Sequence, residues 1–402
     1  MIQSISMKNL RAVLFAVSVC LLATHLALAS TTLDPVAISP ADGRVVAAAF
    51  SPDSRHLAVV RSVNLPAAST RRLTLQLMDL RSGMEVSSAE VPHGEAAELS
   101  FGQHFISYSS DGQHLLIATE GSDNLSVIDA NTLATVKQFA LHAATDSHSI
   151  GGHNGFKGVV SLSIAANSDV FGVMRHDESG EDEVFIGTFS SGAIVKSWSL
   201  GRLRAATQLG ETALSLSRDG SLVAVSVLSD QGGFPKTFHN LRLYNATSGE
   251  VVKSIRTKGL VGQIALMPDE SILAARIDVP GLFSKHTCIE RWKLDDGSLT
   301  DKFCDSGRNV TTVLDASHGA NLVVGYAGQI KNDAEGQYFA GRGRVGIWNL
   351  QTREQVASLG TFRHYVSVKV SPNGRWILAG PLLLEVITAP RPVVSKSTAR
   401  RD

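Results

Sequence analysis

Short runs in which apolar and polar residues alternate recur along the whole chain, and residues typical of tight turns separate them. One recurring phrase is an alternating run, a turn of the Ser-Pro-Asp-Gly type and a second apolar run. Alternation with period 2 indicates β-strands, and Asp, Asn and Gly tolerate or hydrogen-bond the backbone of tight hairpins. The seven turns of this kind span residues 51–54, 109–112, 165–168, 217–220, 267–270, 316–319 and 371–374.

A second phrase, made of a strand, a turn and another strand, follows each of the first six copies. Its copies lie at residues 75–83, 125–132, 184–192, 241–249, 289–297 and 345–352. Each repeat of about 53 residues therefore predicts four short antiparallel strands, which we name a, b, c and d in chain order. Seven such repeats predict an all-β fold, a seven-bladed β-propeller with strand a of every blade at the centre.

The seventh repeat has only three expected strands, around residues 366–370, 376–379 and 382–387. A spare strand-like segment, residues 35–39, precedes the first blade. We expect this N-terminal strand to dock on the last blade and close the ring, because docking covers two exposed sheet edges. The alternative is two packed β-sandwich domains, which account poorly for a repeat that continues without a linker. The expected propeller domain is 30–390, followed by a disordered tail at 391–402.

Composition and charge narrow the class of protein. Apolar residues make up 44% and charged residues 18%, which is enough apolar material for a core and too little charge for a disordered chain. Lys plus Arg and Asp plus Glu are equal at 37 each, so no overall basic field indicates nucleic-acid binding.

The first 29 residues have the parts of a secretory signal peptide. Lys8 and Arg11 precede an apolar run at 12–28, and Ala27-Leu28-Ala29 forms a cleavage site of the Ala-x-Ala type. The run is short for a membrane span, and an uncleaved anchor is the alternative. We expect a periplasmic or secreted protein, with no membrane span after cleavage of the signal.

The repeats carry a family resemblance that covers essentially all of the mature chain. Residues 123–132, Asp-Asn-Leu-Ser-Val-Ile-Asp-Ala-Asn-Thr, resemble the repeat of the YVTN-type propellers of exported bacterial proteins. Residues 345–352, and Trp376 after the turn at 371–374, resemble WD repeats. The Gly-His pair that opens many WD repeats is missing from most copies, and Asn349 replaces the Asp of the Trp-Asp pair. The resemblance implies the propeller fold, which hosts scaffolds, binding proteins and enzymes alike.

Long connections are expected on one face of the propeller. The a–b and c–d turns are all short, whereas long b–c segments occur at 62–71, 175–183, 229–239, 278–286 and 325–343. The longest d-to-a link, 140–158, shares their face because b–c and d-to-a connections both lie opposite the short turns. Long loops on a rigid scaffold commonly carry binding. The alternative is that surface loops simply tolerate insertion.

Aromatic, cationic and imidazole side chains are frequent in these connections. Such a mixture suits a protein, peptide or glycan partner. The alternative for each aromatic side chain is that it only fixes its own loop. The candidate binding residues are Phe234, Phe238, His239, Phe283, Lys285, Tyr338, Arg342, His148 and His153.

No metal, cofactor or catalytic residue is predicted. His142, His148 and His153 match no short metal motif, so exposed histidines are favoured over a metal site. The acidic run at 177–183 lacks the ligand spacing of a calcium loop, and a solvated charged loop is favoured. Gly-x-Ser-x-Gly, phosphate-loop and His-Glu-x-x-His motifs are all missing.

Two classes of function remain. The first is an exported, non-catalytic scaffold that binds its partner on the face with the long b–c connections. The alternative is a propeller enzyme, such as a lactone hydrolase, with a site at the mouth of the central channel; some YVTN-like propellers are similar to lactonases. The absence of catalytic motifs favours the scaffold. The sequence leaves open the partner's identity, the oligomeric state and the source organism.

Two cysteines remain once Cys20 leaves with the signal. Cys288 precedes an expected strand and Cys304 ends the next, and their midpoint is residue 296, inside Asp295-Asp296-Gly297. A three-residue hairpin loop with Gly297 in the left-handed region would place the two cysteines opposite each other. In an exported protein this predicts a Cys288–Cys304 disulfide across blade five. The alternative is a pair of reduced, buried thiols.

Overall fold

The structure is a computed structural model. It describes residues 32–37, 44–64, 71–91, 104–119, 124–141, 158–176, 181–202, 214–229, 238–257, 260–269, 271–277, 288–304, 310–317, 319–333, 336–362 and 368–387. The expected signal peptide and C-terminal tail lie outside these ranges.

Every regular element in the described part of the chain is a β-strand. The a strands are β2 (Arg44–Phe50), β6 (His104–Tyr108), β10 (Gly158–Ile164), β14 (Leu214–Leu216), β18 (Leu260–Met267), β22 (Val310–Ser317) and β26 (Val368–Val370). The b strands are β3 (His56–Asn64), β7 (His114–Thr119), β11 (Val170–His176), β15 (Leu222–Ser229), β19 (Ser271–Ile277), β23 (Leu322–Asp333) and β27 (Trp376–Ala379). The c strands are β4 (Arg71–Asp79), β8 (Asn124–Asp129), β12 (Glu181–Thr188), β16 (Phe238–Asn245), β20 (Cys288–Lys293), β24 (Gly336–Asn349) and β28 (Leu382–Ile387).

The d strands complete the blades. They are β5 (Glu85–Glu90), β9 (Thr135–Ala140), β13 (Ala193–Arg202), β17 (Val251–Arg256), β21 (Leu299–Cys304) and β25 (Gln355–Phe362). Six sheets run a-b-c-d in chain order, and the seventh has the order β1-β28-β27-β26, with β1 (Thr32–Ala37) next to β28. The predicted seven-bladed propeller of four-stranded antiparallel blades is confirmed. That the N-terminal strand closes the ring stays a prediction.

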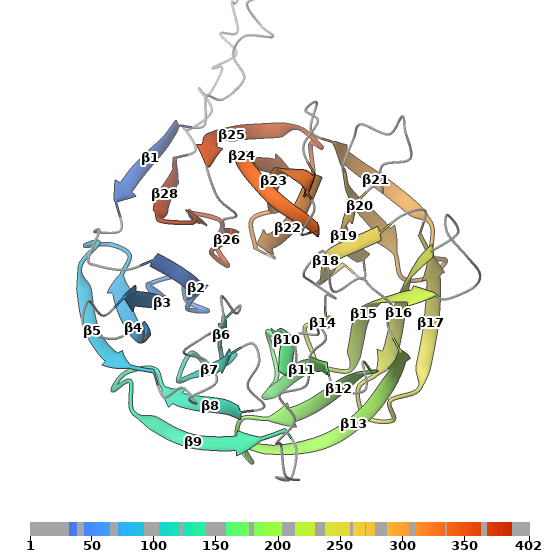
Figure 1. Cartoon of the computed structure of the whole chain (residues 1–402), viewed down its shortest axis with the longest axis horizontal. Helices are drawn as coiled ribbons and strands as arrows, with labels where there is room; N and C mark the ends of the chain where they lie inside the picture. The colour runs from blue at the N-terminus through green and yellow to red at the C-terminus, as the bar shows by residue number, and fades with distance from the viewer. Residues whose placement is uncertain are drawn as a thin grey trace, which may run out of the picture. The chain divides into compact units, whose positions relative to one another are not determined.

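Contacts divide the chain into residues 35–385 and a second unit made of 1–34 and 386–402. Within 35–385 the a strands surround a common centre, and each contacts the a strand of the next blade (Figure 1). The series β2, β6, β10, β14, β18, β22 and β26 returns to β2. Blades one and seven share an apolar cluster in which Leu57 and Leu378 are fully buried. Apolar packing therefore joins the last blade to the first.

Side-chain hydrogen bonds explain the repeated a–b turn. In blade one the Ser51 hydroxyl donates to Asp53 Oδ1 over 2.6 Å and accepts the backbone N–H of His56 over 2.9 Å. Asp53 Oδ1 also accepts the N–H of Arg55. Equivalent bonds recur around Ser109, Ser217 and Ser371. The serine and the Asp or Asn two residues later satisfy backbone donors that a tight hairpin leaves unpaired.

The c–d turns follow a second rule. In six blades the pairing of strands c and d shifts by one residue just before the turn. The turn then places one residue in the left-handed region, and in four blades that residue is Gly, for example Gly83 and Gly249. Leu133 and Arg353 occupy the same place in blades two and six, with φ of 57° and 65°.

This turn bears on the two cysteines. The predicted three-residue loop is wrong, because Lys293 N donates to Ser298 O over 2.9 Å and so closes a loop of four residues. The shift between Arg291 and Trp292 compensates for the extra residue, and Cys288 pairs with Cys304 in the register. Cys288 has the geometry of a disulfide-bonded residue. The predicted register is therefore confirmed, and the bond in the mature protein stays a prediction.

Candidate functional site

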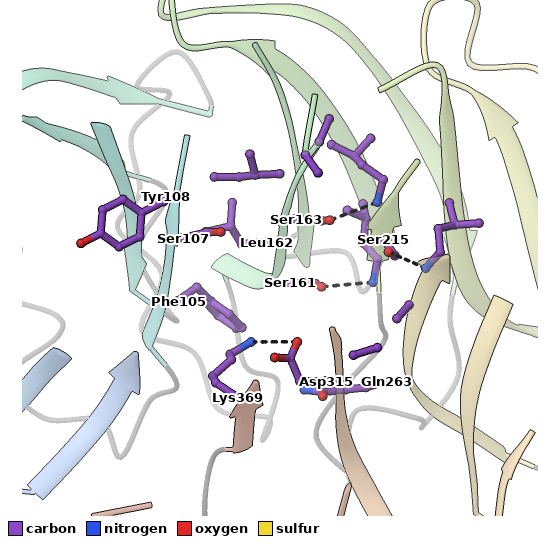
Figure 2. Close-up of a pocket in the computed structure, with 18 of the residues that line it drawn as sticks. Phe105, Ser107, Tyr108, Ser161, Leu162, Ser163, Ser215, Gln263, Asp315 and Lys369 are labelled. Carbon is purple, nitrogen blue, oxygen red and sulfur yellow. Dashed lines mark hydrogen bonds and ion pairs between the residues drawn. The ribbon is translucent and has the colours of Figure 1, made fainter. Parts of the chain in front are cut away.

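The a strands enclose a central channel with a cavity volume of about 370 Å³ (Figure 2). Residues from the a strands and a–b turns of all seven blades line it. Each a strand ends its sheet, so the edge that faces away from strand b has no partner in the sheet order. The backbone N–H groups along such an edge need other acceptors.

Serine hydroxyls of a neighbouring blade supply these acceptors. In Figure 2, Ser161 and Ser163 of β10 accept the N–H groups of β14, at 3.1 Å from Leu214 N and 3.0 Å from Leu216 N. Ser215 of β14 accepts Leu266 N of β18 over 3.0 Å. A hydroxyl that accepts one hydrogen bond still carries a proton that it can donate.

The next two blades use an amide and a carboxylate in the same way. Gln263 Oε1 accepts Leu314 N over 3.0 Å, and Asp315 Oδ2 accepts Val370 N over 2.7 Å. Lys369 of β26 lies across the same seam, with Nζ 3.9 Å from Asp315 Oδ1. Both side chains are partly exposed to the channel, so the attraction is moderated by solvent.

Aromatic residues of β6 occupy another part of the wall. Phe105 is half-buried and lines the cavity. Tyr108 packs among the apolar residues of blades one and two, and in Figure 2 its hydroxyl points away from the labelled serines. Burial raises the pKa of Tyr108, and the Asp53 carboxylate adds to this effect. Tyr108 is therefore a neutral phenol in the physiological range of pH.

None of these channel residues was predicted from the sequence, although the repeats contain a signal for them. Aligned on the a–b turns given above, the position two residues before the first turn residue is polar in four of seven blades, at Ser107, Ser163, Ser215 and Lys369. In blade six strand a continues to Ser317, one residue past the start of the expected turn, and this shift brings Asp315 to the equivalent position.

The predicted binding residues of the long connections are described only in part. Phe234, Phe283, Lys285, His148 and His153 lie outside the described residues. Phe238 and His239 are the first residues of β16 and pair with Ser229 and Leu228. Their role in binding stays a prediction.

The connection expected as a loop at 325–343 is instead an extension of two strands. β23 and β24 pair as far as Asp333 and Gly336, with Tyr338 opposite Lys331. The pairing of β22 ends at Gly328 and that of β25 at Gly343, so two strands form the extension within the described residues. Tyr338 and Arg342 are thus strand residues of this extension, which we call the β23–β24 ribbon (residues 329–342). The length of this connection predicts a loop. Two long strands that pair with each other satisfy their backbone hydrogen-bonding groups equally well.

The described part of the acidic run differs from the prediction of a solvated loop, and residues 177–180 lie outside the described residues. Glu181, Asp182 and Glu183 belong to β12, and Asp182 is 0% exposed. Glu183 Oε2 lies 3.8 Å from Arg175 Nη1 of the paired strand. Glu183 thus gives the buried Arg175 guanidinium an anionic neighbour, as a buried cation needs. Among the described residues no group of three or more His, Cys, Asp or Glu is placed to hold a metal ion.

No helix of the described part is long and apolar enough to cross a membrane. No protein-family model matches the chain, and a comparison with curated proteins finds no match.

Solved propellers resemble the chain closely in structure and weakly in sequence. The Myceliophteria thermophila Cps50 (Swd1) β-propeller domain has a TM-score of 0.59 at 13% identity, over 89% of this chain and 100% of that chain. The RRP9 WD40 repeats have a TM-score of 0.57 at 12% identity, over 88% and 98%. A chain of the Mitotic Checkpoint Complex has a TM-score of 0.57 at 16% identity, over 90% and 93%. This chain shares the β-propeller fold of these structures. At such identities the likeness shows the fold alone.

Proposed function

We propose that the protein is an exported, non-catalytic scaffold that binds a protein or peptide partner through its long-loop face. We use this name for the side of the propeller that carries the b–c connections, the d-to-a links and the β23–β24 ribbon. A glycan chain is the second kind of partner that the predicted aromatic and cationic residues suit.

The asymmetry between the two faces carries the proposal. On the opposite side, hydrogen-bonded a–b turns and tight c–d turns hold the chain close to the blades. The long-loop face has the β23–β24 ribbon, whose pairing continues past the last pairs of β22 and β25. A rigid scaffold with extended segments on one face is typical of binding proteins.

The structural neighbours support a macromolecular partner. One belongs to the Mitotic Checkpoint Complex, one consists of WD40 repeats and one is a β-propeller domain. The propeller fold is commonly a protein-interaction scaffold, and this chain shares that fold over most of its length. Binding of a protein is therefore favoured over binding of a glycan chain.

The channel gives less support to the alternative of a lactone hydrolase. Such an enzyme needs several carboxylates or histidines that converge on one mouth of the channel. Among the described residues that line the cavity, Asp315 is the only carboxylate, and it already holds Val370 N and Lys369. A carboxylate held in this way is poorly placed to act as a base or a metal ligand.

Capture from the envelope fraction tests the proposed binding face. The ribbon variant Tyr338→Ala/Arg342→Ala is compared with a matched variant on the opposite face, Arg81→Ala/Arg218→Ala, whose residues are exposed. We expect the ribbon variant to lose the partners that the wild type and the control retain. If the control variant loses the partners and the ribbon variant retains them, binding occurs on the face with the short turns and the proposal is wrong.

Export and catalysis are tested separately. Cell fractionation with N-terminal sequencing is expected to find a mature chain that begins at Ser30, and a cytoplasmic chain that keeps Met1 or Met7 would overturn export.

A screen with simple lactones is expected to show no turnover. Turnover that the conservative substitution Asp315→Asn abolishes would favour the enzyme instead.

A further inference from the structure

We propose that the central channel is a binding site for a small neutral saccharide, of the size of one pyranose ring. This site is distinct from the long-loop face, because it is built from the a strands and a–b turns rather than from the long connections. Three properties of the described lining carry the proposal: its hydrogen-bonding groups, its charge balance and its aromatic wall.

The hydrogen-bonding groups suit a ligand that both donates and accepts. Ser161, Ser163 and Ser215 each use an oxygen lone pair for a backbone N–H of the next blade, so their protons are directed to other acceptors. The free edges of the a strands add backbone carbonyl groups to the walls of the channel. A sugar hydroxyl satisfies a donor and an acceptor at once, whereas a carboxylate offers acceptors alone.

The charges of the lining favour a neutral ligand. Lys369 is the single cation and Asp315 the single anion among the described lining residues, and they lie 3.9 Å apart. An anion would have to break this pair and leave Asp315 with an unfavourable neighbour. A polyol can instead bridge the ammonium and carboxylate groups with two adjacent hydroxyls and leave the pair intact.

The aromatic wall and the size of the cavity indicate the shape and the size of the ligand. Phe105 lines the cavity and gives an apolar surface for the C–H face of a sugar ring. The cavity of about 370 Å³ has room for a small ligand and several waters, since roughly 10–15 Å³ of the same measure holds one water. One pyranose ring fits this space together with the waters that complete its hydrogen bonds.

Ligand-observed saturation-transfer NMR on the mature protein tests the site. The probes are D-glucose, D-galactose and N-acetyl-D-glucosamine, with acetate and inorganic phosphate as anionic probes. We expect at least one sugar to bind saturably with a Kd of about 1 mM, and both anions to bind at least about tenfold more weakly. In the same titration the backbone amide signals of Leu214 and Leu266 shift, because their acceptors line the site.

Two conservative variants identify the site. Phe105→Leu keeps an apolar side chain without the ring, and Asp315→Asn keeps an oxygen for Val370 N without the charge. Each is expected to weaken sugar binding by about tenfold, while Val252→Ala, on the outer rim with 60% exposure, leaves it unchanged. The ribbon variant Tyr338→Ala/Arg342→Ala also leaves it unchanged, which separates this site from the proposed partner face.

Three results would overturn the proposal. One is that no sugar of the set binds saturably and the amides of Leu214 and Leu266 do not move. Another is that both channel variants fold, as judged by their thermal transitions, and bind the sugar as the wild type does. The third is that acetate or phosphate binds more tightly than every sugar. If a variant fails to fold, the amide shifts of the wild type decide the question.

Discussion

Arg353 Nε lies 2.8 Å from Asp301 Oδ1, so the c–d turn of blade six is joined to the outermost strand of blade five. The carboxylate of Asp301 is 7% exposed, and Arg291 Nη1 of its own blade lies 3.7 Å away. Arg353 has φ of 65°, in the left-handed region where four other blades have Gly. The ion pair offsets the cost of placing a side chain in that region.

At the corresponding contacts between earlier blades the cation lies on strand d and the acceptor lies in the turn. Lys137 of β9 donates from Nζ to the backbone carbonyl of Ser191, over 2.7 Å, in the c–d turn of blade three. Lys253 of β17 donates to the carbonyl of Asp295 in the turn of blade five. At the corresponding position of strand d in blade five stands Asp301, an anion. Here the cation, Arg353, comes from the neighbouring turn instead.

Substitution of Arg353 separates the ion pair from the backbone strain. Arg353→Ala removes the pair and keeps the left-handed residue, so we expect a loss of about 1 kcal/mol in the free energy of unfolding. Arg353→Gly also removes the pair but relieves a backbone cost of about 1 kcal/mol, so its stability stays near that of the wild type. Urea titration of the three proteins measures both effects. An Ala variant as stable as the Gly variant would contradict this account of the turn.

Acid stability depends on the a–b turns. Asp219 accepts hydrogen bonds from the hydroxyl of Ser217, the N–H of Ser221 and the hydroxyl of Ser221, and these bonds lower its pKa below the usual 3.8. A lowered folded pKa gives stability that is present above 3.8 and is lost as the pH falls through the folded pKa. We expect Asp219→Asn to be less sensitive to acid between about pH 5 and pH 2 than the wild type.

Blade seven supplies the natural control for that experiment. Asn373 makes the equivalent bonds, to the Ser371 hydroxyl at 2.8 Å and to Arg375 N at 2.9 Å, without a titrating group. Thermal transitions recorded along a pH series compare Asp219→Asn with Asn373→Asp. We expect Asn373→Asp to steepen the acid limb that Asp219→Asn flattens. Parallel acid limbs in all three proteins would show that these turns do not carry the dependence.

The sequence predicts the blades well because one local rule builds each of them. Alternating strands and the Ser-x-Asp or Ser-x-Asn turn are short-range features, and the hydrogen bonds of Ser51 and Asp53 stay within five residues. Seven copies then set the fold, since each blade packs chiefly on its neighbours. The b–c and d-to-a connections carry no repeat, and length alone therefore predicts a loop where the β23–β24 ribbon forms.

The channel could not be predicted by the same reasoning. Ser161 and Leu214, or Asp315 and Val370, belong to neighbouring blades and meet only when the ring forms. Nothing in the sequence around a single polar strand residue indicates from which backbone N–H its side chain will accept a hydrogen bond. The buried position of Asp182 is missed for a similar reason, because the strand state of Asp182 and Glu183 depends on pairing with β11.

The cysteine pair of blade five gives a chemical prediction. Cys288 and Cys304 are paired in the register, so alkylation of the mature exported protein without reductant is expected to modify neither. A bond that closes a loop of roughly 15 residues stabilises the folded state by about 3 kcal/mol at most in the chain-entropy model. Cys288→Ser/Cys304→Ser should therefore lower the free energy of unfolding by up to that amount. Mass spectrometry that finds both cysteines alkylated would rule out the bond.

The base of the β23–β24 ribbon depends on a glycine covered by an aromatic ring. A Cβ added to Gly343 would overlap the ring of Tyr326, which is buried against it. Tyr326 pairs with Val345, and Gly343 lies two residues away on the same face of the strand. Gly343→Ala must displace the buried ring, so we expect a loss of about 1–3 kcal/mol in the free energy of unfolding. Gly360→Ala on the adjacent strand β25 is the matched control, because nothing lies within 4 Å of its added Cβ. Equal urea midpoints for the two variants would show that the ring does not anchor the ribbon, whereas loss of stability in Gly343→Ala alone would show that it does.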